Sequence, residues 1–299
     1  MPQKKLIKIQ SIIFCGIAYA ASLMSLLMTN FDEKFSLITL VAFIVTLGVP
    51  HGSLDTLFAK ELFNLDHLKK WSKFVVSYSI IASIVITLWL LLPTLFLIFF
   101  LVISIIHFSD DLVAGTPNST RILYGGIIIF LPALLHSNEL TLLYGYLISI
   151  EHATWIVNAC HFIAFPWLLG LLLVTYQLKR FNITTILEIS AVAMLAILIT
   201  PLLAFTIYFC TMHSSRHLIR SMSYLKYNSK KIIIGSLVVP TVVVIIGLGA
   251  WMNIIPFSMD EAIIKIIFVT LAALTVPHMM LLERSGFSNW IKVNGVNRQ

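Results

Sequence analysis

Two histidines, His213 and His217, stand four residues apart in the stretch Cys210-Thr-Met-His-Ser-Ser-Arg-His-Leu-Ile-Arg220, at the end of a strongly apolar segment. If this stretch is helical, both imidazoles leave the same face, with their Cβ atoms about 5–6 Å apart. Two rings at this spacing can bind one metal ion, as helical His-x-x-x-His pairs do in zinc sites. The alternative is an interfacial pair that simply ends a membrane helix, so the metal interpretation needs support from the rest of the chain.

The elements that must position these side chains are expected to be membrane helices. Of the 299 residues, 59% are hydrophobic and 11% are charged, whereas a soluble domain carries about 25% charged residues. A chain of this composition cannot cover a water-exposed surface. We therefore expect an all-α, polytopic membrane bundle that forms a single domain over residues 1–299.

Loop charge predicts how this bundle is oriented. Ten apolar segments can be drawn, at residues 6–28, 35–49, 72–92, 94–107, 122–135, 152–178, 183–200, 202–221, 232–253 and 261–282. With ten spans, the loops of one side hold every Lys and Arg except Lys34 and Lys265. The positive-inside rule then places both termini in the cytoplasm, in a multi-pass protein of the cell (inner) membrane. The net charge of +7 is a signal of topology and does not indicate a nucleic-acid partner.

This topology sorts the nine histidines by depth. Five of them reach the cytoplasmic level of the bilayer, whereas His67 falls in an inner loop and the rest on the outer side: His136, His152 and His161. Polar side chains inside a membrane are costly and mark functional sites by default. A divalent metal would satisfy several imidazoles together, and imidazole binds iron, zinc, copper and nickel, so residue type alone does not choose the metal. The five at the inner level are His51, His107, His213, His217 and His278.

Charged side chains near this level have two interpretations. Asp55 lies one turn after the first of the five histidines, and Asp110 lies three residues after the second. Both carboxylates could orient metal ligands from behind, or they could be loop carboxylates that pair with lysines. The lysine pairing is the expected role of Asp111. Arg216 points away from the paired histidines on a helix, and we expect it to contact phospholipid.

Four motifs occur in a fixed order along the chain: Gly48-Val-Pro-His-Gly-Ser-Leu-Asp55, His107-Phe-Ser-Asp110, His213-Ser-Ser-Arg-His217 and Pro277-His278-Met279. They resemble the Gly-x-Pro-His-Gly-Ala-x-Asp signature, the His-Phe-Gly stretch, the His-x-x-x-His pair and the late Pro-His-Met element of the Brp/Blh family of bacterial and archaeal β-carotene 15,15′-dioxygenases. The agreement runs from about residue 40 to residue 285. Ser53 and Ser109 depart from the usual Ala and Gly. Thr56 stands where a further His often follows the Asp, which puts any role of that His in doubt.

The resemblance implies a membrane-embedded non-haem Fe(II) dioxygenase that splits the central 15,15′ double bond of β-carotene with O₂ to give two molecules of all-trans-retinal. It also implies that the iron is bound by His51, His107, His213 and His217, with no other catalytic side chain. Five further side chains are expected to lie behind these ligands or to face the substrate: Asp55, Asp110, His278, Phe108 and Trp155. The retinal would link the enzyme to a retinal-binding rhodopsin.

Other functional classes remain open at the level of sequence. A multi-span transporter or proton-coupled carrier would use the histidines as a relay and the proline-broken helices as its binding site, although no inverted repeat is evident. A di-iron desaturase or hydroxylase needs several His-rich clusters, and this chain has a single His-x-x-x-His pair. An assembly factor for another membrane protein is also compatible with the sequence.

Overall fold

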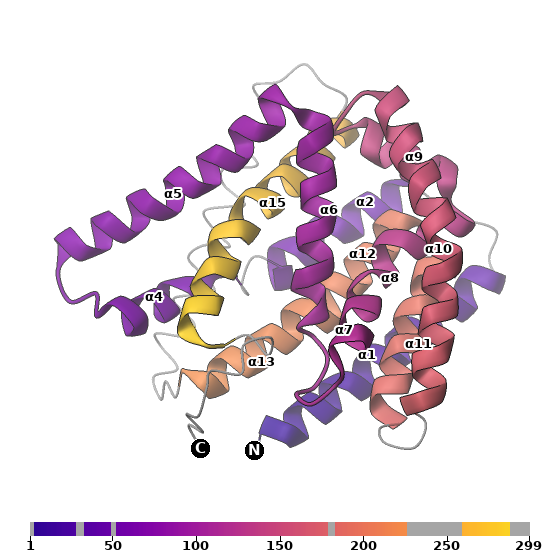
Figure 1. Cartoon of the computed structure of the whole chain (residues 1–299), viewed down its shortest axis with the longest axis horizontal. Coiled ribbons are helices and arrows are strands. Elements are labelled where there is room, and N and C mark those ends of the chain that lie inside the picture. Colours follow the sequence, from indigo (N-terminus) through magenta and orange to yellow (C-terminus); the bar gives the residue numbers. More distant parts are fainter. Residues whose placement is uncertain (1–2, 28–32, 49–51, 179–182, 226–258, 288–299) are drawn as a thin grey trace.

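The computed structural model describes residues 3–27, 33–48, 52–178, 183–225 and 259–287, and within these ranges every regular element is a helix. The elements carry the labels of Figure 1: α1 (Gln3–Leu27), α2 (Glu33–Phe43), η1 (Ile44–Gly48), α4 (Asp55–Phe63), α5 (Leu68–Leu91), α6 (Pro93–Ser109), α7 (Asn118–Gly125), α8 (Ile127–Phe130), η2 (Leu131–Leu134), α9 (Ser137–Gly145), α10 (Ile150–Leu178), α11 (Ile183–Leu198), α12 (Pro201–Ile207), η3 (Tyr208–Ser214), α13 (Ser215–Tyr224) and α15 (Met259–Ser285).

The outer surface of the molecule is apolar, and polar side chains lie on packed faces. On α1 the buried face includes Gln10 and Ser22, whereas Ile12 is 62% exposed. Helix α5 buries none of its residues, and its exposed side chains include the large hydrophobic residues Ile84 and Leu90. This arrangement is costly in water and favourable in hydrocarbon. It indicates a membrane protein.

Four helices are long and apolar enough to cross a membrane: Gln3–Leu27, Leu68–Leu91, Ile150–Gln177 and Glu261–Ser285. A fifth candidate is the pair Asn118–Leu134 and Ser137–Gly145, which is bent by 108°. All the apolar segments drawn from the sequence coincide with helical elements, except residues 232–253, which lie outside the described part of the chain. The segment at 122–135 is divided among α7, α8 and η2, whereas the segment at 202–221 is a continuous helical run in which the π turn η3 joins α12 to α13.

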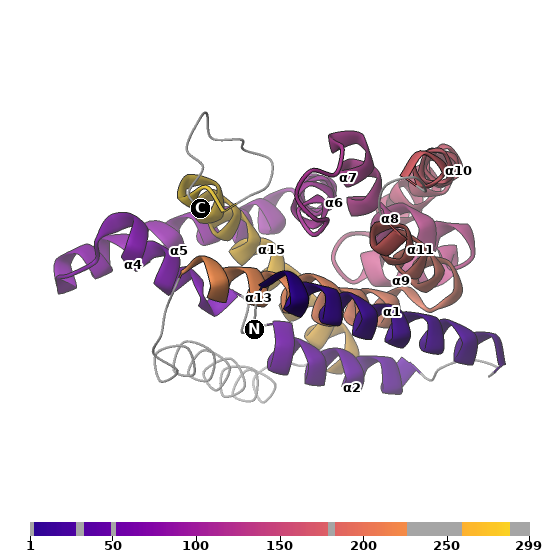
Figure 2. The same cartoon turned by 90° about the horizontal axis from the view of Figure 1, so that it is seen from below.

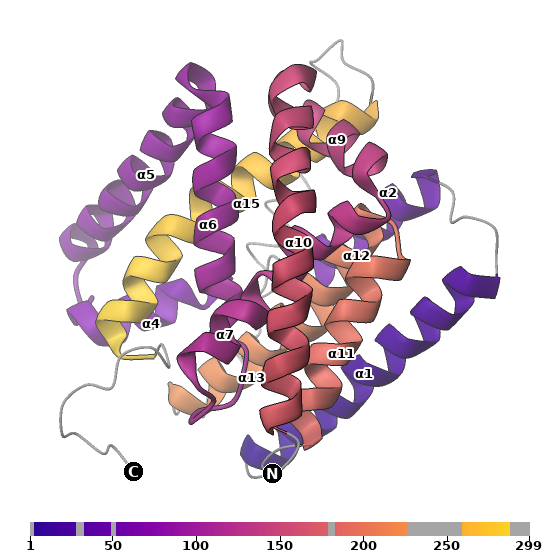
Figure 3. The ribbon, with the colours of Figure 1, turned by 45° about the vertical axis from the view of Figure 1, so that its right-hand side comes forward.

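The helices group into two neighbouring packs joined through α6. Helix α5 runs beside α15, and α6 contacts both of them as well as α10 (Figure 1). On the other side of α6, helix α10 packs against α11, and α11 packs against α1 (Figure 3). Seen from below, α2 and α10 lie on opposite sides of the molecule (Figure 2). Three segments distant in sequence meet between these packs: the C-terminal end of α6, the first turn of α13 and the C-terminal part of α15.

Polar contacts join α1 to α11 along their length. Tyr19 Oη lies 2.6 Å from Ser190 Oγ, and the Ser25 hydroxyl donates to the Leu198 carbonyl at 2.7 Å. Nearer the N-terminal end of α1, the Ser11 hydroxyl donates to Glu188 at 2.6 Å. Apolar side chains gain little by leaving lipid for a helix interface, so packing and interhelical hydrogen bonds contribute most to such contacts.

A widened turn precedes the paired histidines. Residues Tyr208–Ser214 form a π-helical turn rather than the α-helix expected from the sequence, and α13 continues from Ser215. The Ser215 hydroxyl donates to the Cys210 carbonyl, five residues back, at 2.8 Å. Single π turns inside helices recur at functional sites, where they shift the side chains that follow. Here the turn carries His213, so it sets the direction of that ring.

Candidate functional site

Four histidines from three separate segments gather in the interior: His107 at the end of α6, His213 on η3, His217 on α13 and His278 on α15. All four side chains are buried. The ring centroids of His107 and His213 are 4.4 Å apart, and those of His107 and His278 are 5.4 Å apart. The ring of His217 lies 5.0 Å from that of His278 and 6.5 Å from that of His213. The described residues thus bring together four of the five histidines expected at one level.

Two buried carboxylates orient two of these rings in the same way. Asp111 Oδ1 lies 2.9 Å from Nδ1 of His213, and Asp55 Oδ1 lies 2.6 Å from Nδ1 of His278. The second oxygen of each carboxylate accepts a tyrosine hydroxyl. A carboxylate behind one ring nitrogen is typical of histidines that bind metal through the other, because it holds the tautomer and the ring direction. The Nε2 atoms of both histidines are buried.

The donor set fits a divalent transition metal by residue type and by orientation. Neutral imidazole suits iron, zinc, copper or nickel, and the carboxylates at Nδ1 of His213 and His278 leave Nε2 of each ring as the atom that could bind one. Within the residues that the structure describes, no group of three or more His, Cys, Asp or Glu side chains already has the spacing of a bound ion. His51 lies outside the described residues, although Gly48 and Gly52 on either side of it line the adjoining cavity.

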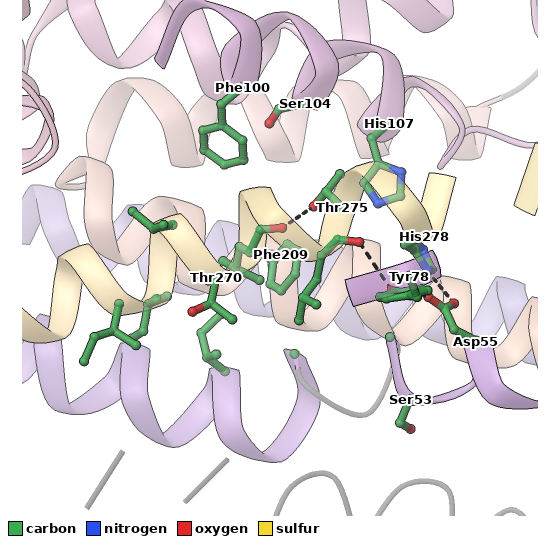
Figure 4. A pocket seen from close by; sticks show the side chains of 18 of the residues that line it. Ser53, Asp55, Tyr78, Phe100, Ser104, His107, Phe209, Thr270, Thr275 and His278 are labelled. Atoms are coloured by element: carbon green, nitrogen blue, oxygen red, sulfur yellow. Dashed lines mark hydrogen bonds and ion pairs between the residues drawn. The ribbon is translucent and has the colours of Figure 1, made fainter. Parts of the chain in front are cut away.

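A cavity of about 890 Å³ adjoins the histidine cluster between α5, α6 and α15. His107 and His278 both line it, and Figure 4 shows His278 beside Asp55 and Tyr78, with the His107 ring approaching from another helix. Along α15 the lining continues to Ala262, which is 16 residues before His278 in sequence, or about 24 Å at the rise of an α-helix. Most of the wall is apolar. A long, apolar ligand could therefore extend from the cluster along α15.

Comparison with known proteins identifies the family. The family model "Beta-carotene 15,15'-dioxygenase" matches residues 42–284. The chain is 31% identical over 255 residues to the "Beta-carotene 15,15'-dioxygenase" of uncultured marine bacterium 66A03, an alignment that covers 81% of this chain and 91% of that protein. This chain belongs to the β-carotene 15,15′-dioxygenase family. No solved structure matches it.

Membership of the β-carotene 15,15′-dioxygenase family confirms the resemblance inferred from the motifs, and it makes the chain an enzyme. The matched region spans all four motifs, together with every helix that supplies a histidine to the cluster. Family membership does not favour the carrier interpretation, because the relative and the family model both bear the name of a dioxygenase.

The two neighbouring aspartates after α6 have exchanged their expected roles. Asp110, expected behind a histidine, forms an ion pair with Arg220 at 3.0 Å. Asp111, expected to pair with lysines, is the carboxylate that orients His213. Consecutive residues point in directions about 100° apart near a helix end, so only one of the two can face the bundle interior. The sequence offered no means of choosing between them.

Arg216 does not contact phospholipid as the sequence suggested. Its side chain is 1% exposed, and its guanidinium lies 2.6 Å from a Glu188 oxygen. It also donates to Gln10 on α1 and to the Asp111 carbonyl. The expectation was wrong because it treated the helix face opposite the histidines as a lipid face, whereas α1 and α11 cover it. Removing one partner of such a buried pair costs about 3–5 kcal/mol.

The aromatic candidates separate clearly. Phe108 is buried, lines the cavity and packs edge-on against His213 with ring centroids 5.0 Å apart. Trp155 is 63% exposed on α10 and is not part of the cavity wall. His152, three residues before Trp155 on α10, lies 2.8 Å from the Thr94 hydroxyl and is not part of the histidine cluster. The structure places Trp155 on the outer surface.

The remaining histidines lie in contacts outside the cluster. His161 Nδ1 lies 2.7 Å from the Ala133 carbonyl, and His136 lies beside Glu139. His67 is exposed in the turn before α5. The sequence analysis had likewise placed these histidines outside the group of five expected at one level.

Sequence reasoning missed the two tyrosines that complete the carboxylate contacts. Tyr78 donates to Asp55 Oδ2 at 2.7 Å, and Tyr208 donates to Asp111 Oδ2 at 2.8 Å. Both stand in apolar runs without a motif. Their one distinguishing signal was a polar hydroxyl at membrane depth, which requires a hydrogen-bond partner.

Proposed function

We propose that this protein is a membrane-embedded non-haem Fe(II) dioxygenase that cleaves the central 15,15′ double bond of β-carotene with O₂ and releases two molecules of all-trans-retinal. The observation that carries the proposal is a cluster of buried imidazoles at the inner end of a long, mostly apolar cavity. Family membership supports the same reaction, because the relative carries that activity in its name.

The proposed iron ligands are His51, His107, His213 and His217. Bound iron would supply the activation of O₂, which apolar side chains and imidazoles cannot provide by themselves. The chain's own contribution is orientation: Asp111 and Tyr208 hold the ring of His213, and Ser221 Oγ lies 3.2 Å from Nε2 of His217. That contact holds the ring of His217 on α13.

The cavity explains how an apolar polyene would be held. Phe100, Phe205 and Phe209 contribute aromatic faces to the wall, and such faces pack well against a flat conjugated chain. Because water is a poor solvent for the substrate and lipid is a good one, the apolar outer surface around α5 supports entry from the membrane. Central cleavage requires the 15,15′ bond to lie beside the imidazoles, so one half of the polyene would extend from the cluster along α15.

The proposed setting is the cell (inner) membrane, with the chain as one domain of ten spans and both termini in the cytoplasm. The distribution of Lys and Arg between alternate loops supports this topology. Membrane lipid is then the medium that delivers β-carotene. The product, retinal, is the chromophore that a rhodopsin requires, so we also propose a functional link to a retinal-binding rhodopsin.

Expression in cells that accumulate β-carotene tests the proposal. The wild-type protein should remove the orange pigment and produce retinal in the extract, and purified protein should hold about one iron per chain. His213→Ala should abolish retinal formation while the protein still reaches the membrane fraction, because the proposed ligand that Asp111 orients is lost. His67→Ala, a matched change in the exposed turn, should leave the yield unchanged. Retinal formation at the wild-type rate in His213→Ala would overturn the ligand assignment.

A further inference from the structure

His278 lies among the proposed iron ligands rather than behind them. Its ring is 5.4 Å from that of His107 and 5.0 Å from that of His217, measured between centroids. Both distances are shorter than the 6.5 Å that separates the paired rings of His213 and His217. By position, His278 belongs to the cluster as closely as the residues of the helical pair.

The contacts of His278 repeat those of His213. In each case Nδ1 faces a buried carboxylate oxygen, at 2.6 Å for Asp55 and 2.9 Å for Asp111. In each case the other carboxylate oxygen accepts a tyrosine hydroxyl, at 2.7 Å from Tyr78 and 2.8 Å from Tyr208. The chain therefore contains two Tyr–Asp–His units, supplied by unrelated segments, that converge on one point.

This arrangement determines which nitrogen can bind. The carboxylate is the acceptor in each unit, so Nδ1 of the imidazole carries the proton. The lone pair is then on Nε2, across the ring from the carboxylate. A neutral imidazole in this tautomer is prepared for a metal, and the carboxylate behind it raises its basicity.

His278 also differs from His213 in what it faces. His107 and His278 line the cavity, whereas His213 and His217 are not part of its wall. A ligand at this position would stand between the cluster and the polyene. It would therefore determine where the open side of the site points.

We propose that His278, held by Asp55 and Tyr78, is a further metal ligand of this site, so that α15 supplies one imidazole alongside those of α6, η3 and α13. The inference rests on the proposed function, because it assumes that the cluster binds a metal. Asp55 and Tyr78 are positioning residues that act through the ring of His278.

Metal binding to purified protein tests this inference independently of activity. Protein stripped with a chelator is titrated with Co²⁺ under anaerobic conditions, and both the affinity and the visible spectrum of the bound ion are recorded. His278→Gly should weaken binding by about 100-fold or more and change the spectrum, and added free imidazole should restore both. Tyr78→Phe should weaken binding by about 10-fold, the lower end of the range for partners behind a ligand.

One control variant and the wild-type protein make each outcome decisive. Tyr176→Phe removes a hydroxyl from a side chain that is 79% exposed on α10, and it should leave Co²⁺ binding unchanged. If His278→Gly binds Co²⁺ with wild-type affinity and spectrum, His278 is not a ligand and this inference alone fails. If the wild-type protein binds neither iron nor Co²⁺, the proposed function fails as well. Should His278→Gly not reach the membrane, wild-type affinity in Tyr78→Phe would overturn the positioning role.

Discussion

At the scale of single residues, the direction of one carboxylate decides what its neighbour can do. Helix α6 ends at Ser109, and the next two residues are both aspartates. Asp111 turns inward to His213 and Tyr208, and Asp110 turns to Arg220 near the surface. The chemistry of the pair is identical, so their different roles come entirely from direction and burial.

Substituting the two aspartates separately tests this difference. Asp111→Asn should lower metal affinity by about 10- to 100-fold, because an amide is a weaker partner for the Nδ1–H of a metal-binding histidine. Asp110→Asn also replaces a carboxylate by an amide, but it removes only the partly exposed ion pair with Arg220. Metal affinity should therefore stay within about 2-fold of wild type. Metal titration of both purified variants provides the measurement, and a larger effect from Asp110→Asn would contradict the assignment.

At the scale of elements, close packing of α7 on α6 holds the end of the helix that carries His107. Gly125 is the contact point, because a Cβ atom built there would lie 2.1 Å from the Ile105 carbonyl oxygen and 2.9 Å from the Ser109 nitrogen. These are backbone atoms, which cannot move aside as a flexible side chain can. The glycine thus allows α7 to approach the last turn of α6.

The variant Gly125→Ala should therefore force the two helices apart. We expect a loss of stability of about 1–3 kcal/mol, the usual cost of overpacking, together with reduced metal binding because His107 moves with α6. Gly16→Ala is the matched control, since no atom of the described residues lies within 4 Å of a Cβ at that exposed position on α1. It should be neutral or stabilising by up to about 1 kcal/mol. Thermal unfolding in detergent compares the two, and equal midpoints would contradict the packing argument.

At the scale of the whole molecule, the two helix packs serve different purposes. The α1, α10 and α11 side is joined by interhelical contacts such as Ser11 to Glu188. On the other side, the cavity lies between α5, α6 and α15. The histidine cluster lies where the two sides meet, so metal binding and substrate binding can be disturbed separately.

Filling the cavity away from the cluster tests this separation. Thr270 lines the wall eight residues before His278, about 12 Å along α15. Thr270→Trp should reduce retinal formation by at least about 10-fold, because a bulky ring occupies the space for the polyene, while iron per chain stays unchanged. Leu173→Trp, at a position 58% exposed on α10, should alter neither. Full retinal formation in Thr270→Trp would show that the substrate lies elsewhere.

The sequence by itself determined the helical class, the family and most of the histidines that gather. Composition indicated membrane helices, and counting apolar segments with their flanking charges predicted which histidines would lie at one level. The His213 and His217 pair was visible because helical spacing is a local property. The pair could be predicted because its spacing lies within about one turn of helix, and the family could be predicted because its four motifs are short and occur in a fixed order.

Only the tertiary structure decided which partners meet across the bundle. Asp55 and His278 are 223 positions apart, and Asp111 and His213 are 102 apart, so no local pattern joins them. The same holds for Arg216, which the sequence predicted to face lipid and which the structure places in contact with Gln10 of α1 and Glu188 of α11. Direction at a helix end and coverage of a helix face both depend on long-range packing, and a one-dimensional pattern does not contain that information.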